Sequence, residues 1–515
     1  MNICVLEHPR IRSEQRFNDI ANTPLWSCLM GGYAASSLKA AGHDVVFMDA
    51  AVSGWGFEQT QHEIVSQTPD MLCVNAVYLW EHTGRLFDFL SNLRKEGFRG
   101  HITLFGFYPT LAYRAILENV PVVDSIVVGE CENALTNLAQ WVCGDAASAR
   151  VPGIAARTVK GVELMCHSEA CREPDDFALP ERMAASGQSA GILGSRGCYN
   201  HCVFCPVPSF YHQGPMWRGR SPENILEEIS SLVDLGYKDF YFLDPNFIGP
   251  GPGGKKRIHK LMEMMQPLHI SFGMETRPND LDAGLLEMMV SAGLKSLLMG
   301  IESGSASVLG GLRKGACPAS AATAIRLCRE AGIDPEIGFL MFVPDSTLSD
   351  LKANLAFLRE NSLLDRLERT ANLLGHRQIV LMGTSGYRMY QEQKRLVPTG
   401  VFGFEGDVAY RDPRVYWLSR IMIHGCLSVL RTMEDTDSII FWRNCRRPGK
   451  HAAAADKVNQ YLVNLFQRLL SIAEKPGLLP DANEMKQVVS MELNDLCSTP
   501  RETKPSPLEV KPKKP

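Results

Sequence analysis

The sequence lacks the features that would place this protein in a membrane, on nucleic acid or outside the cell. No stretch of about eighteen consecutive apolar residues occurs, so no membrane-spanning helix is expected. The first residues do not form a charged leader with an apolar run and a small-residue cleavage site. Basic residues gather only at the extreme C-terminus, and the formal net charge is -4, which argues against a broad cationic face for nucleic acid. We therefore expect a cytoplasmic protein that binds neither membrane nor nucleic acid.

The sequence also lacks a disulfide scaffold. Its 15 cysteines are few for 515 residues, and an odd count fits paired bridges poorly. Most of them, such as Cys4, Cys73 and Cys426, lie singly in apolar runs, where a thiol packs as a small hydrophobic group. A chain of this length is too long for one core, so two or three domains are expected.

Short apolar runs alternate with helical patterns over roughly residues 1–145. Because these runs do not alternate apolar with polar residues, they predict parallel strands covered on both faces. The pattern predicts a doubly wound, Rossmann-like α/β domain, followed by a weakly periodic connecting segment at 146–188. The expected strands are 3–6, 45–48, 71–77, 102–105 and 125–128, and the expected helices include 29–41, 83–95 and 134–142.

A second series of strands and helices predicts a partial (β/α)6 barrel over residues 189–395, with its active site at the C-terminal ends of the strands. Apolar residues at i, i+3 and i+4 spacing then predict a small helical C-terminal domain over 396–497. The Pro- and Lys-rich tail 498–515 is predicted to be disordered. The expected barrel strands are 191–195, 240–243, 270–274, 296–300, 338–343 and 378–382.

One group of cysteines differs from the rest. Cys198, Cys202 and Cys205 are spaced C-x3-C-x2-C, directly after the first expected barrel strand. A loop of this length can wrap three corners of a cubane iron–sulfur cluster, leaving the fourth iron open to chelate a small molecule. A structural zinc knuckle completed by His201 or by a distant fourth ligand is the alternative, although the second C-x2-C pair typical of such sites is missing.

Together with Phe204 before the last cysteine, the motif resembles the radical S-adenosylmethionine (SAM) superfamily. The resemblance implies that the three cysteines bind a [4Fe-4S] cluster, whose open iron holds SAM. It also implies an external one-electron donor of flavodoxin or ferredoxin type, which drives cleavage to a 5′-deoxyadenosyl radical. Polar residues at the ends of the next strands would line the SAM site: Asp244, Asn246, Glu275, Arg277, Glu302 and Ser303. From residue types alone, Asp244 and Asn246 are equally turn residues, and Arg277 is equally a structural ion-pair partner of Glu275 or Glu302.

A doubly wound sheet ahead of such a barrel resembles cobalamin-dependent radical SAM methyltransferases and related anaerobic tetrapyrrole-modifying enzymes, over roughly residues 1–395. Loops at the carboxyl ends of the first sheet would then hold the corrin. No D-x-H-x-x-G motif supplies a lower axial histidine, so Trp80 or Leu79 is expected to cover that face, with His82 as an alternative cobalt ligand. A vestigial domain without corrin is the other interpretation. The expected cobalamin-binding residues are Trp80, Gly106, Pro109, Thr110, Gly129 and Glu130.

The resemblance implies a C-methyltransferase acting on an unactivated carbon of a small molecule such as a tetrapyrrole or a secondary metabolite. The alternative is radical chemistry without methyl transfer, such as cyclisation, dehydration or anaerobic hydroxylation. A non-enzymatic cluster protein for electron transfer or sensing is a third hypothesis. Methyl transfer would produce both S-adenosylhomocysteine and 5′-deoxyadenosine, whereas the second hypothesis predicts only 5′-deoxyadenosine.

Overall fold

The computed structural model describes residues 1–11, 29–144, 150–166, 173–183, 189–212, 214–445 and 448–497. The chain divides into two compact units, Met1–Phe357 with Arg377–Arg411 and Leu358–His376 with Asp412–Pro515. The first unit contains both predicted α/β parts. The tail 498–515 lies outside the described residues.

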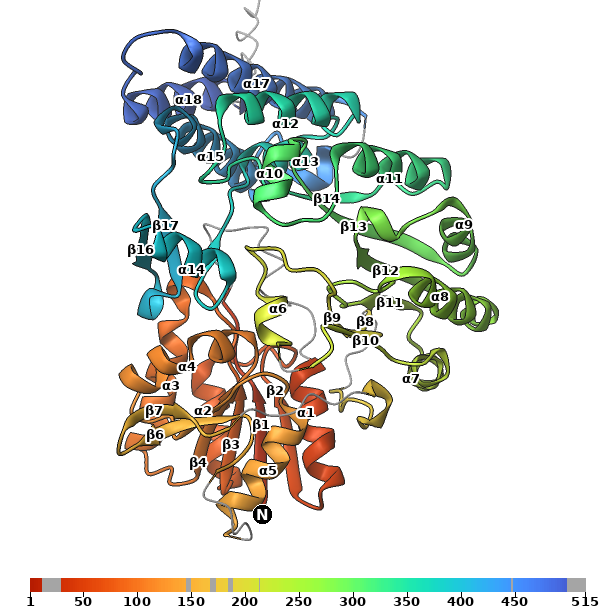
Figure 1. Cartoon of the computed structure of the whole chain (residues 1–515), viewed down its shortest axis with the longest axis vertical. Helices are drawn as coiled ribbons and strands as arrows, with labels where there is room; N and C mark the ends of the chain where they lie inside the picture. Colours follow the sequence, from red (N-terminus) through yellow and green to blue (C-terminus); the bar gives the residue numbers. More distant parts are fainter. Residues whose placement is uncertain are drawn as a thin grey trace, which may run out of the picture. The chain divides into compact units, whose positions relative to one another are not determined.

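The N-terminal part is built on a seven-stranded sheet with the order β2-β1-β3-β4-β5-β6-β7 (Figure 1). Its first five strands are parallel and coincide with the predicted apolar runs. The order β2-β1-β3-β4-β5 is that of flavodoxin-like sheets, which bind ligands where the order reverses, between β1 and β3. The prediction of a doubly wound fold is thus confirmed. These strands are β1 (Asn2–Glu7), β2 (Asp44–Asp49), β3 (Met71–Asn75), β4 (His101–Phe105) and β5 (Ser125–Val127).

Helices cover both faces of this sheet. Along β1, Ile3 and Val5 pack with α1 (Leu29–Ala40) and α5 (Glu132–Val142). Cys4 and Leu6 point to the other face and belong to the larger core formed with the remaining helices. Because neighbouring residues are buried on opposite faces, the strand is a continuous apolar run. The helices on the second face are α2 (Phe57–Gln67), α3 (Gly84–Lys95) and α4 (Phe107–Asn119), with a short η2 (Trp80–His82).

The segment interpreted as a connection contributes two more strands to the first sheet. β6 (Ile154–Thr158) and β7 (Gly161–Leu164) form an antiparallel hairpin that pairs with β5. The side chains of β7 alternate between exposed and half-buried, so this edge hairpin carries little apolar signal in the sequence. A short η3 (Pro174–Asp176) follows.

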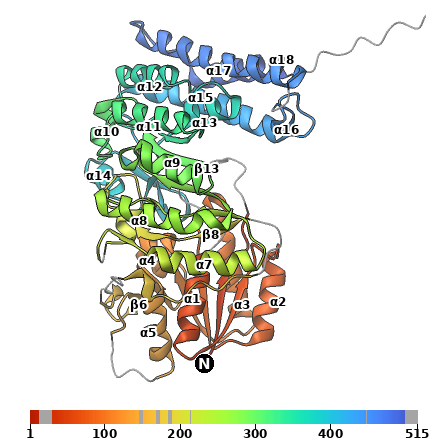
Figure 2. The same cartoon turned by 90° about the vertical axis from the view of Figure 1, so that its right-hand side faces the viewer.

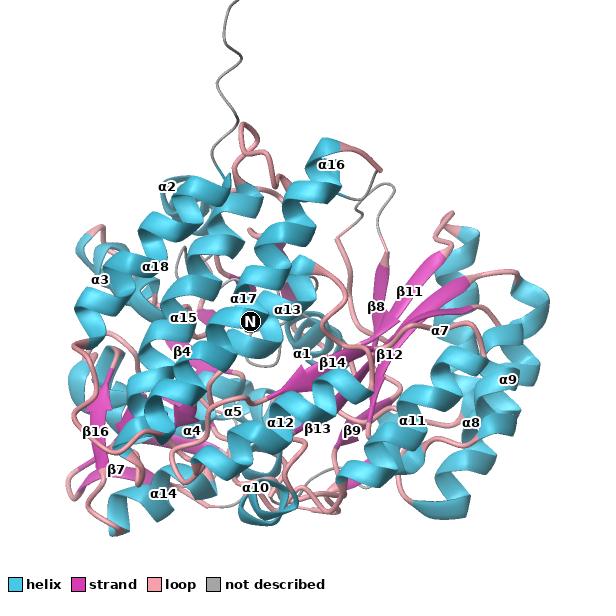
Figure 3. Ribbon diagram, turned by 90° about the horizontal axis from the view of Figure 1, so that it is seen from above, coloured by secondary structure: helices cyan, strands magenta, loops and turns pink. Residues whose placement is uncertain are grey.

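The barrel part is a parallel five-stranded sheet with the order β14-β13-β12-β11-β8, seen as adjacent magenta strands in Figure 3. Ser221 caps α7 by accepting a hydrogen bond from the Asn224 amide, and Gly236 follows the helix end with a φ of +94°, as the sequence predicts. The strands are β8 (Ala190–Ile192), β11 (Asp239–Phe242), β12 (Ser271–Thr276), β13 (Leu294–Glu302) and β14 (Glu336–Phe339). The helices are α7 (Pro222–Asp234), α8 (Gly251–Met265), α9 (Ala283–Ser291), α10 (Ala306–Gly311), α11 (Pro318–Glu330) and α12 (Leu348–Glu360), with η4 (Gln266–Leu268) and η5 (Pro278–Asp280).

The sixth predicted barrel strand, 378–382, differs in the structure. Next to β14 only a single parallel bridge forms, between Phe342 and Arg377. The following residues form β15 (Val380–Leu381), which pairs antiparallel with β17 (Glu405–Val408), itself paired with β16 (Leu396–Thr399). The Met382 amide also donates to the Phe404 carbonyl, so the backbone groups of this run are taken by the later segment rather than by the barrel. The remaining elements of this unit are β9 (Ser195–Gly197), α6 (Val207–Phe210), β10 (Trp217–Gly219), α14 (Ser385–Glu392) and η6 (Val401–Gly403).

The second unit is helical, and α17 and α18 run beside each other in Figure 2. Its bounds differ from the predicted 396–497, because 396–408 belong to β16 and β17, and the unit combines Leu358–His376 with the residues from Asp412 onward. Asp412 caps α15, with Pro413 in its first turn. Among the described residues, none of the helices combines the length and apolar character needed to span a bilayer. The helices are α13 (Leu367–Gly375), α15 (Pro413–Glu434), α16 (Trp442–Cys445), α17 (Lys450–Glu474) and α18 (Ala482–Cys497).

Candidate functional site

The three predicted cysteines lie on one loop between β9 and α6. Gly197, which precedes Cys198, has a φ of +83°, and a Cβ there would lie 2.1 Å from the Met216 carbonyl oxygen, so the loop entry requires glycine. Cys202 is buried, and Cys198 and Cys205 are half-buried. Burial raises the pKa of the Cys202 and Cys205 thiols. Metal binding by these thiols therefore has to release protons.

Backbone and amide contacts hold the cysteine loop in shape. The Val203 amide donates to the Leu312 carbonyl (3.0 Å), and the Val203 carbonyl accepts from the Gly386 amide (2.8 Å). Asn200 Nδ2 lies 2.9 Å from Cys202 Sγ and also donates to the carbonyls of Arg313 (3.1 Å) and Lys314 (2.9 Å). Phe204 packs against a buried apolar cluster beside the loop. The cluster is formed by Val203, Val308, Leu312, Leu340 and Val343.

A buried ion pair lies beside Cys202. Lys314 Nζ is 2.8 Å from Glu302 Oε1, and both side chains are over nine-tenths buried. Burial lowers the pKa of Lys314, but the Glu302 carboxylate and the neighbouring Cys202 together leave this pKa raised. The Lys314 ammonium in turn opposes the effect of burial on the pKa of Cys202. Glu302 thus pairs with a lysine that the sequence analysis did not single out.

Arg277 connects the end of β12 to the cluster loop. Its Nη2 donates to the Lys314 carbonyl (2.6 Å), and its guanidinium lies over the Tyr199 ring, 5.1 Å from the centroid. The Tyr199 hydroxyl donates to Asp280 (2.5 Å), which also accepts from Asn246 Nδ2 (2.9 Å). The ends of β11 and β12 and the cysteine loop are therefore joined in one polar network, although Arg277 bonds a carbonyl rather than the predicted carboxylates.

Two buried polar atoms at the end of β12 have no hydrogen-bond partner among the described residues. They are Nε of Arg277 and Oγ1 of Thr276. Buried donors of this kind are normally satisfied, so their position at the carboxyl end of a barrel strand fits a bound polar ligand.

Three other predicted SAM-site residues hold the strand ends together. Asp244 is fully buried and accepts from the Gly194 amide (2.9 Å) and the Ser195 hydroxyl, and burial raises the pKa of Asp244 to about 6. Burial raises the pKa of Glu275 to about 7. Ser303 Oγ donates to Asn354 Oδ1 (2.6 Å). Their contact with SAM stays a prediction.

The predicted corrin-binding loops follow β4 and β5. Gly106 has a φ of +109°, and a Cβ there would lie 2.3 Å from Asn75 Oδ1. The buried Thr110 hydroxyl accepts from the Gly129 amide (3.0 Å), which ties the two loops together beside the buried Pro109. Gly129 also has a positive φ of +93°. Glu130 does not point freely outward but pairs with Arg218 of β10 (2.9 Å).

Trp80 lies in an aromatic core. It is only 6% exposed, has a φ of +47°, and packs edge-on against Tyr78 with the ring centroids 6.1 Å apart. Tyr78 and Tyr108 both contact Phe404, at 4.5 and 4.7 Å between centroids. The loop after β3 is thus packed against the segment that leads into β17, and its contact with a corrin stays a prediction.

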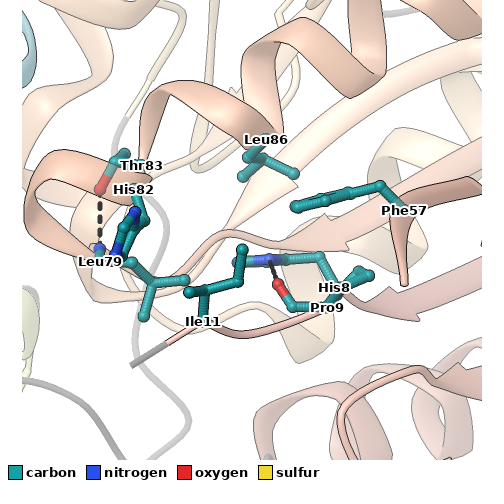
Figure 4. Close-up of a pocket in the computed structure, with 8 residues that line it drawn as sticks. All are labelled: His8, Pro9, Ile11, Phe57, Leu79, His82, Thr83 and Leu86. Carbon is teal, nitrogen blue, oxygen red and sulfur yellow. Dashed lines mark hydrogen bonds between the residues drawn. The ribbon is translucent and has the colours of Figure 1, made fainter. Parts of the chain in front are cut away.

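A small pocket lies where the strand order of the first sheet reverses, at the ends of β1 and β3 (Figure 4). The His8 imidazole contacts the Pro9 carbonyl through Nδ1 (2.8 Å) and the Val77 amide through Nε2 (3.2 Å). Burial lowers the pKa of His8 to about 3, so it is neutral at physiological pH. His82 Nε2 lies 3.8 Å from Glu81. The pocket is lined by His8, Pro9, Ile11, Phe57, Leu79, His82, Thr83 and Leu86.

The cysteine loop and the carboxyl edge of the first sheet meet directly. Phe107, the first residue of α4 after β4, stacks on Phe210 of α6 with 4.1 Å between the ring centroids. Phe107, Cys198 and Cys205 all pack against the same buried trio of Val207, Phe210 and Tyr211. A group bound at this edge of the sheet would therefore lie next to the cysteine loop.

Comparison with known proteins matches residues 192–358 to the family model described as the Radical SAM superfamily. The chain carries a radical SAM domain. Such a domain holds a [4Fe-4S] cluster and SAM, and it takes electrons from an external donor to act on a small-molecule substrate, so the predicted radical SAM enzyme is confirmed at this level.

This radical SAM enzyme has relatives with different named reactions. It is 25% identical over 352 residues to an uncharacterized methyltransferase of Pyrococcus horikoshii, covering 64% of this chain and 72% of the relative. It is 27% identical over 362 residues to the anaerobic magnesium-protoporphyrin IX monomethyl ester cyclase of Rubrivivax gelatinosus, covering 65% of this chain and 62% of the cyclase. The match therefore spans less than two thirds of the cyclase.

The fold of the radical SAM enzyme is similar to a solved structure of OxsB, described as a cobalamin-dependent S-adenosylmethionine radical enzyme with aqua-cobalamin and SAM bound. The TM-score is 0.75 at 19% identity, covering 96% of this chain and 79% of OxsB. The likeness confirms the predicted fold class of a Rossmann-like domain followed by a radical SAM barrel.

Proposed function

We propose that the protein is a cobalamin-dependent C-methyltransferase that acts on an unactivated carbon of a small molecule, a tetrapyrrole or a secondary metabolite. The observation that carries the proposal is the packing of Phe107, Cys198 and Cys205 on one apolar trio. It brings the carboxyl edge of the first sheet, where doubly wound folds bind ligands, next to the cluster loop. The cobalamin named for OxsB and the methyltransferase named in Pyrococcus horikoshii support it.

The residues of the site fit the groups that this function needs. Three free thiols, an amide donor at one sulfur and a buried lysine nearby suit a cluster with one open iron. When bound, the cluster and SAM supply the radical, and the corrin supplies the methyl group. The unpaired Arg277 Nε is the donor that we assign to the SAM carboxylate.

The chain's other residues contribute orientation and exclusion of water. We assign Asp244, Asn246, Glu275, Glu302 and Ser303 to the walls of the SAM site, because all five lie at the ends of consecutive barrel strands. Trp80, Gly106, Pro109, Thr110, Gly129 and Glu130 remain the residues that we assign to the corrin edge. We also propose a flavodoxin- or ferredoxin-type electron donor and no nucleic-acid substrate.

A second candidate is radical chemistry without methyl transfer. The cyclase of Rubrivivax gelatinosus, at 27% identity over 362 residues, favours it because cyclisation is one of the reactions that this hypothesis includes. Both candidates use the same cluster loop, so only the products separate them.

The test is a product assay on anaerobically reconstituted enzyme supplied with iron, sulfide, hydroxocobalamin, SAM and titanium(III) citrate. We expect retained corrin, with 5′-deoxyadenosine and S-adenosylhomocysteine both detected by mass spectrometry. Cys202→Ala should lose 5′-deoxyadenosine, whereas Cys328→Ala, a buried cysteine of α11, should keep it. Corrin-free enzyme that forms only 5′-deoxyadenosine would favour the second candidate, and undiminished cleavage by Cys202→Ala would refute both.

A further inference from the structure

Two buried arginines of the β9–β10 hairpin point at the loop that follows β5. Arg196 Nη2 on β9 lies 2.7 Å from Glu132 Oε1, and Arg218 Nη2 on β10 lies 2.9 Å from Glu130 Oε1. The arginines are 3% and 5% exposed, and Glu132 is 1% exposed. Buried ion pairs are costly to break from one side, because the remaining charge is left uncompensated.

The two arginines depend on both carboxylates. Arg196 and Arg218 are directly opposite each other in the antiparallel register of β9 and β10. Like charges opposite each other destabilise a strand pair, so each guanidinium needs its own carboxylate. Arg196 is held further by the rings of Tyr33 and Phe177, at 4.4 and 5.2 Å from the centroids, which leaves it one orientation.

These pairs fix one end of the cysteine loop, and an aromatic stack fixes the other. Arg196 precedes Cys198 by two residues, and its partner Glu132 begins α5 of the first sheet. After Cys205, Phe210 of α6 stacks on Phe107 at the start of α4, and α6 contacts α4 (Figure 1). The loop is thus anchored at its entry and its exit to two neighbouring loops on the carboxyl edge of one sheet.

We propose that Glu130 and Glu132 are positioning residues that hold the cysteine loop at a fixed distance from the group bound on the carboxyl edge of the first sheet. The inference rests on the proposed function, since the distance matters only if a corrin is bound there. A fixed distance is required because the radical and the methyl group must reach the same substrate carbon, and small displacements in such an arrangement cost rate steeply. At this edge, Glu130 acts through its ion pair with Arg218.

The test measures the distance between the two cofactors and needs no substrate. In the reduced holoenzyme reconstituted with hydroxocobalamin, the paramagnetic cluster accelerates the relaxation of the cobalt(II) electron-spin resonance signal. Glu132→Gln keeps the size of the side chain but removes its charge. We expect it to retain iron and corrin while its half-saturation power falls by about twofold or more, because a released loop moves the cluster away.

The matched control is Asp124→Asn. Asp124 precedes β5, at the opposite end of the same strand, and its pair with Arg94 (2.6 Å) lies away from the cysteine loop. This variant should keep the wild-type half-saturation power. If Glu132→Gln does not fold, Phe107→Leu removes the exit stack without removing a charge and should give the same decrease.

The positioning role would be overturned if a folded Glu132→Gln variant kept the wild-type half-saturation power. If that variant does not fold, the same result in Phe107→Leu would overturn it. Failure of the proposed function is recognised separately in the wild-type enzyme, which would then either retain no corrin signal or form no S-adenosylhomocysteine.

Discussion

At the residue scale, Asn200 places a side-chain hydrogen-bond donor beside a cluster cysteine. Its Nδ2 lies 2.9 Å from Cys202 Sγ, and hydrogen bonds to cluster sulfurs favour the more negative, reduced state. We predict that Asn200→Ala lowers the cluster's reduction potential by about 40 mV, the equivalent of one hydrogen bond of about 1 kcal/mol in a one-electron couple.

The measurement is a redox titration followed by electron-spin resonance. Asn279→Ala is the control, because Asn279 Nδ2 donates to the Gly315 carbonyl (2.8 Å), which directly follows the Arg313 and Lys314 carbonyls that Asn200 contacts, rather than to a cysteine sulfur. It should leave the potential unchanged. An equal shift in both variants would assign the effect to the segment rather than to the sulfur contact.

Asp244 gives a prediction for the pH dependence of stability. Burial raises the pKa of Asp244 to about 6 from an ordinary value near 3.8, so the folded state binds more protons than the unfolded state between these values. Stability contributed by the protonated carboxyl is therefore present below about pH 4 and is lost as the pH rises through about 6.

Asp244→Asn removes this titration and keeps an acceptor for the Gly194 amide. Wild-type protein should lose up to about 3 kcal/mol relative to this variant between pH 4 and 7, measured by urea unfolding of the metal-free protein. A difference between the two proteins that does not change with pH would show that the Asp244 carboxyl is already ionised throughout this range.

The cysteines could be predicted from the sequence because their ligand spacing is local, whereas the charges around them could not. Lys314 reaches Glu302 only after β13 ends and α10 turns the chain back, and Glu132 of α5 pairs with Arg196 of β9, which lies far away in the sequence. The hydrophobic periodicity of the sequence does not predict which charged residues pair. Trp80 illustrates the same limit, because it packs on Tyr78, and Tyr78 in turn contacts Phe404, which lies more than 300 residues later in the sequence.

At the scale of elements, the start of α14 is hydrogen-bonded to the cysteine loop. The Gly386 amide donates to the Val203 carbonyl, and a Cβ at Gly386 would lie 2.8 Å from that oxygen. We predict that Gly386→Ala destabilises the protein by about 1–3 kcal/mol, because overpacking pushes the loop, and that it lowers the iron content after reconstitution.

Gly310→Ala is the matched control, because Gly310 lies in α10 with no atom within 4 Å of an added Cβ. It should change stability by less than about 1 kcal/mol, on the stabilising side, and keep the full iron content. If the iron content fell equally in both variants, the prediction that the α14 contact supports the cysteine loop would be wrong.

The strands of both parallel sheets could be predicted because burial on two faces leaves continuous apolar runs. The same signal misassigned 378–382, since β15 is equally apolar but finds its partner in β17 rather than beside β14. The hairpin β6–β7 was missed for the opposite reason, because an exposed edge needs few apolar residues. Apolar pattern therefore identifies strands, while the pairing partner is set by the rest of the fold.

At the scale of the whole molecule, every residue that we assign to the cluster, SAM and corrin lies in the first of the two compact units. Ligands that bind only the folded state stabilise what they contact, by about 2.7 kcal/mol at a hundredfold excess over the dissociation constant. We predict that SAM and hydroxocobalamin slow amide hydrogen exchange in 1–357 and 377–411. Exchange in α15 and α17 of the second unit should stay as it is in the unliganded protein.

The measurement is exchange mass spectrometry on the anaerobic, cluster-loaded full chain. In the Cys202→Ala control, the SAM-dependent part of the protection should disappear. Protection that increases equally in α15 and α17 would mean that the two units unfold as one, and the cofactors would then stabilise the helical unit as well as the α/β unit that binds them.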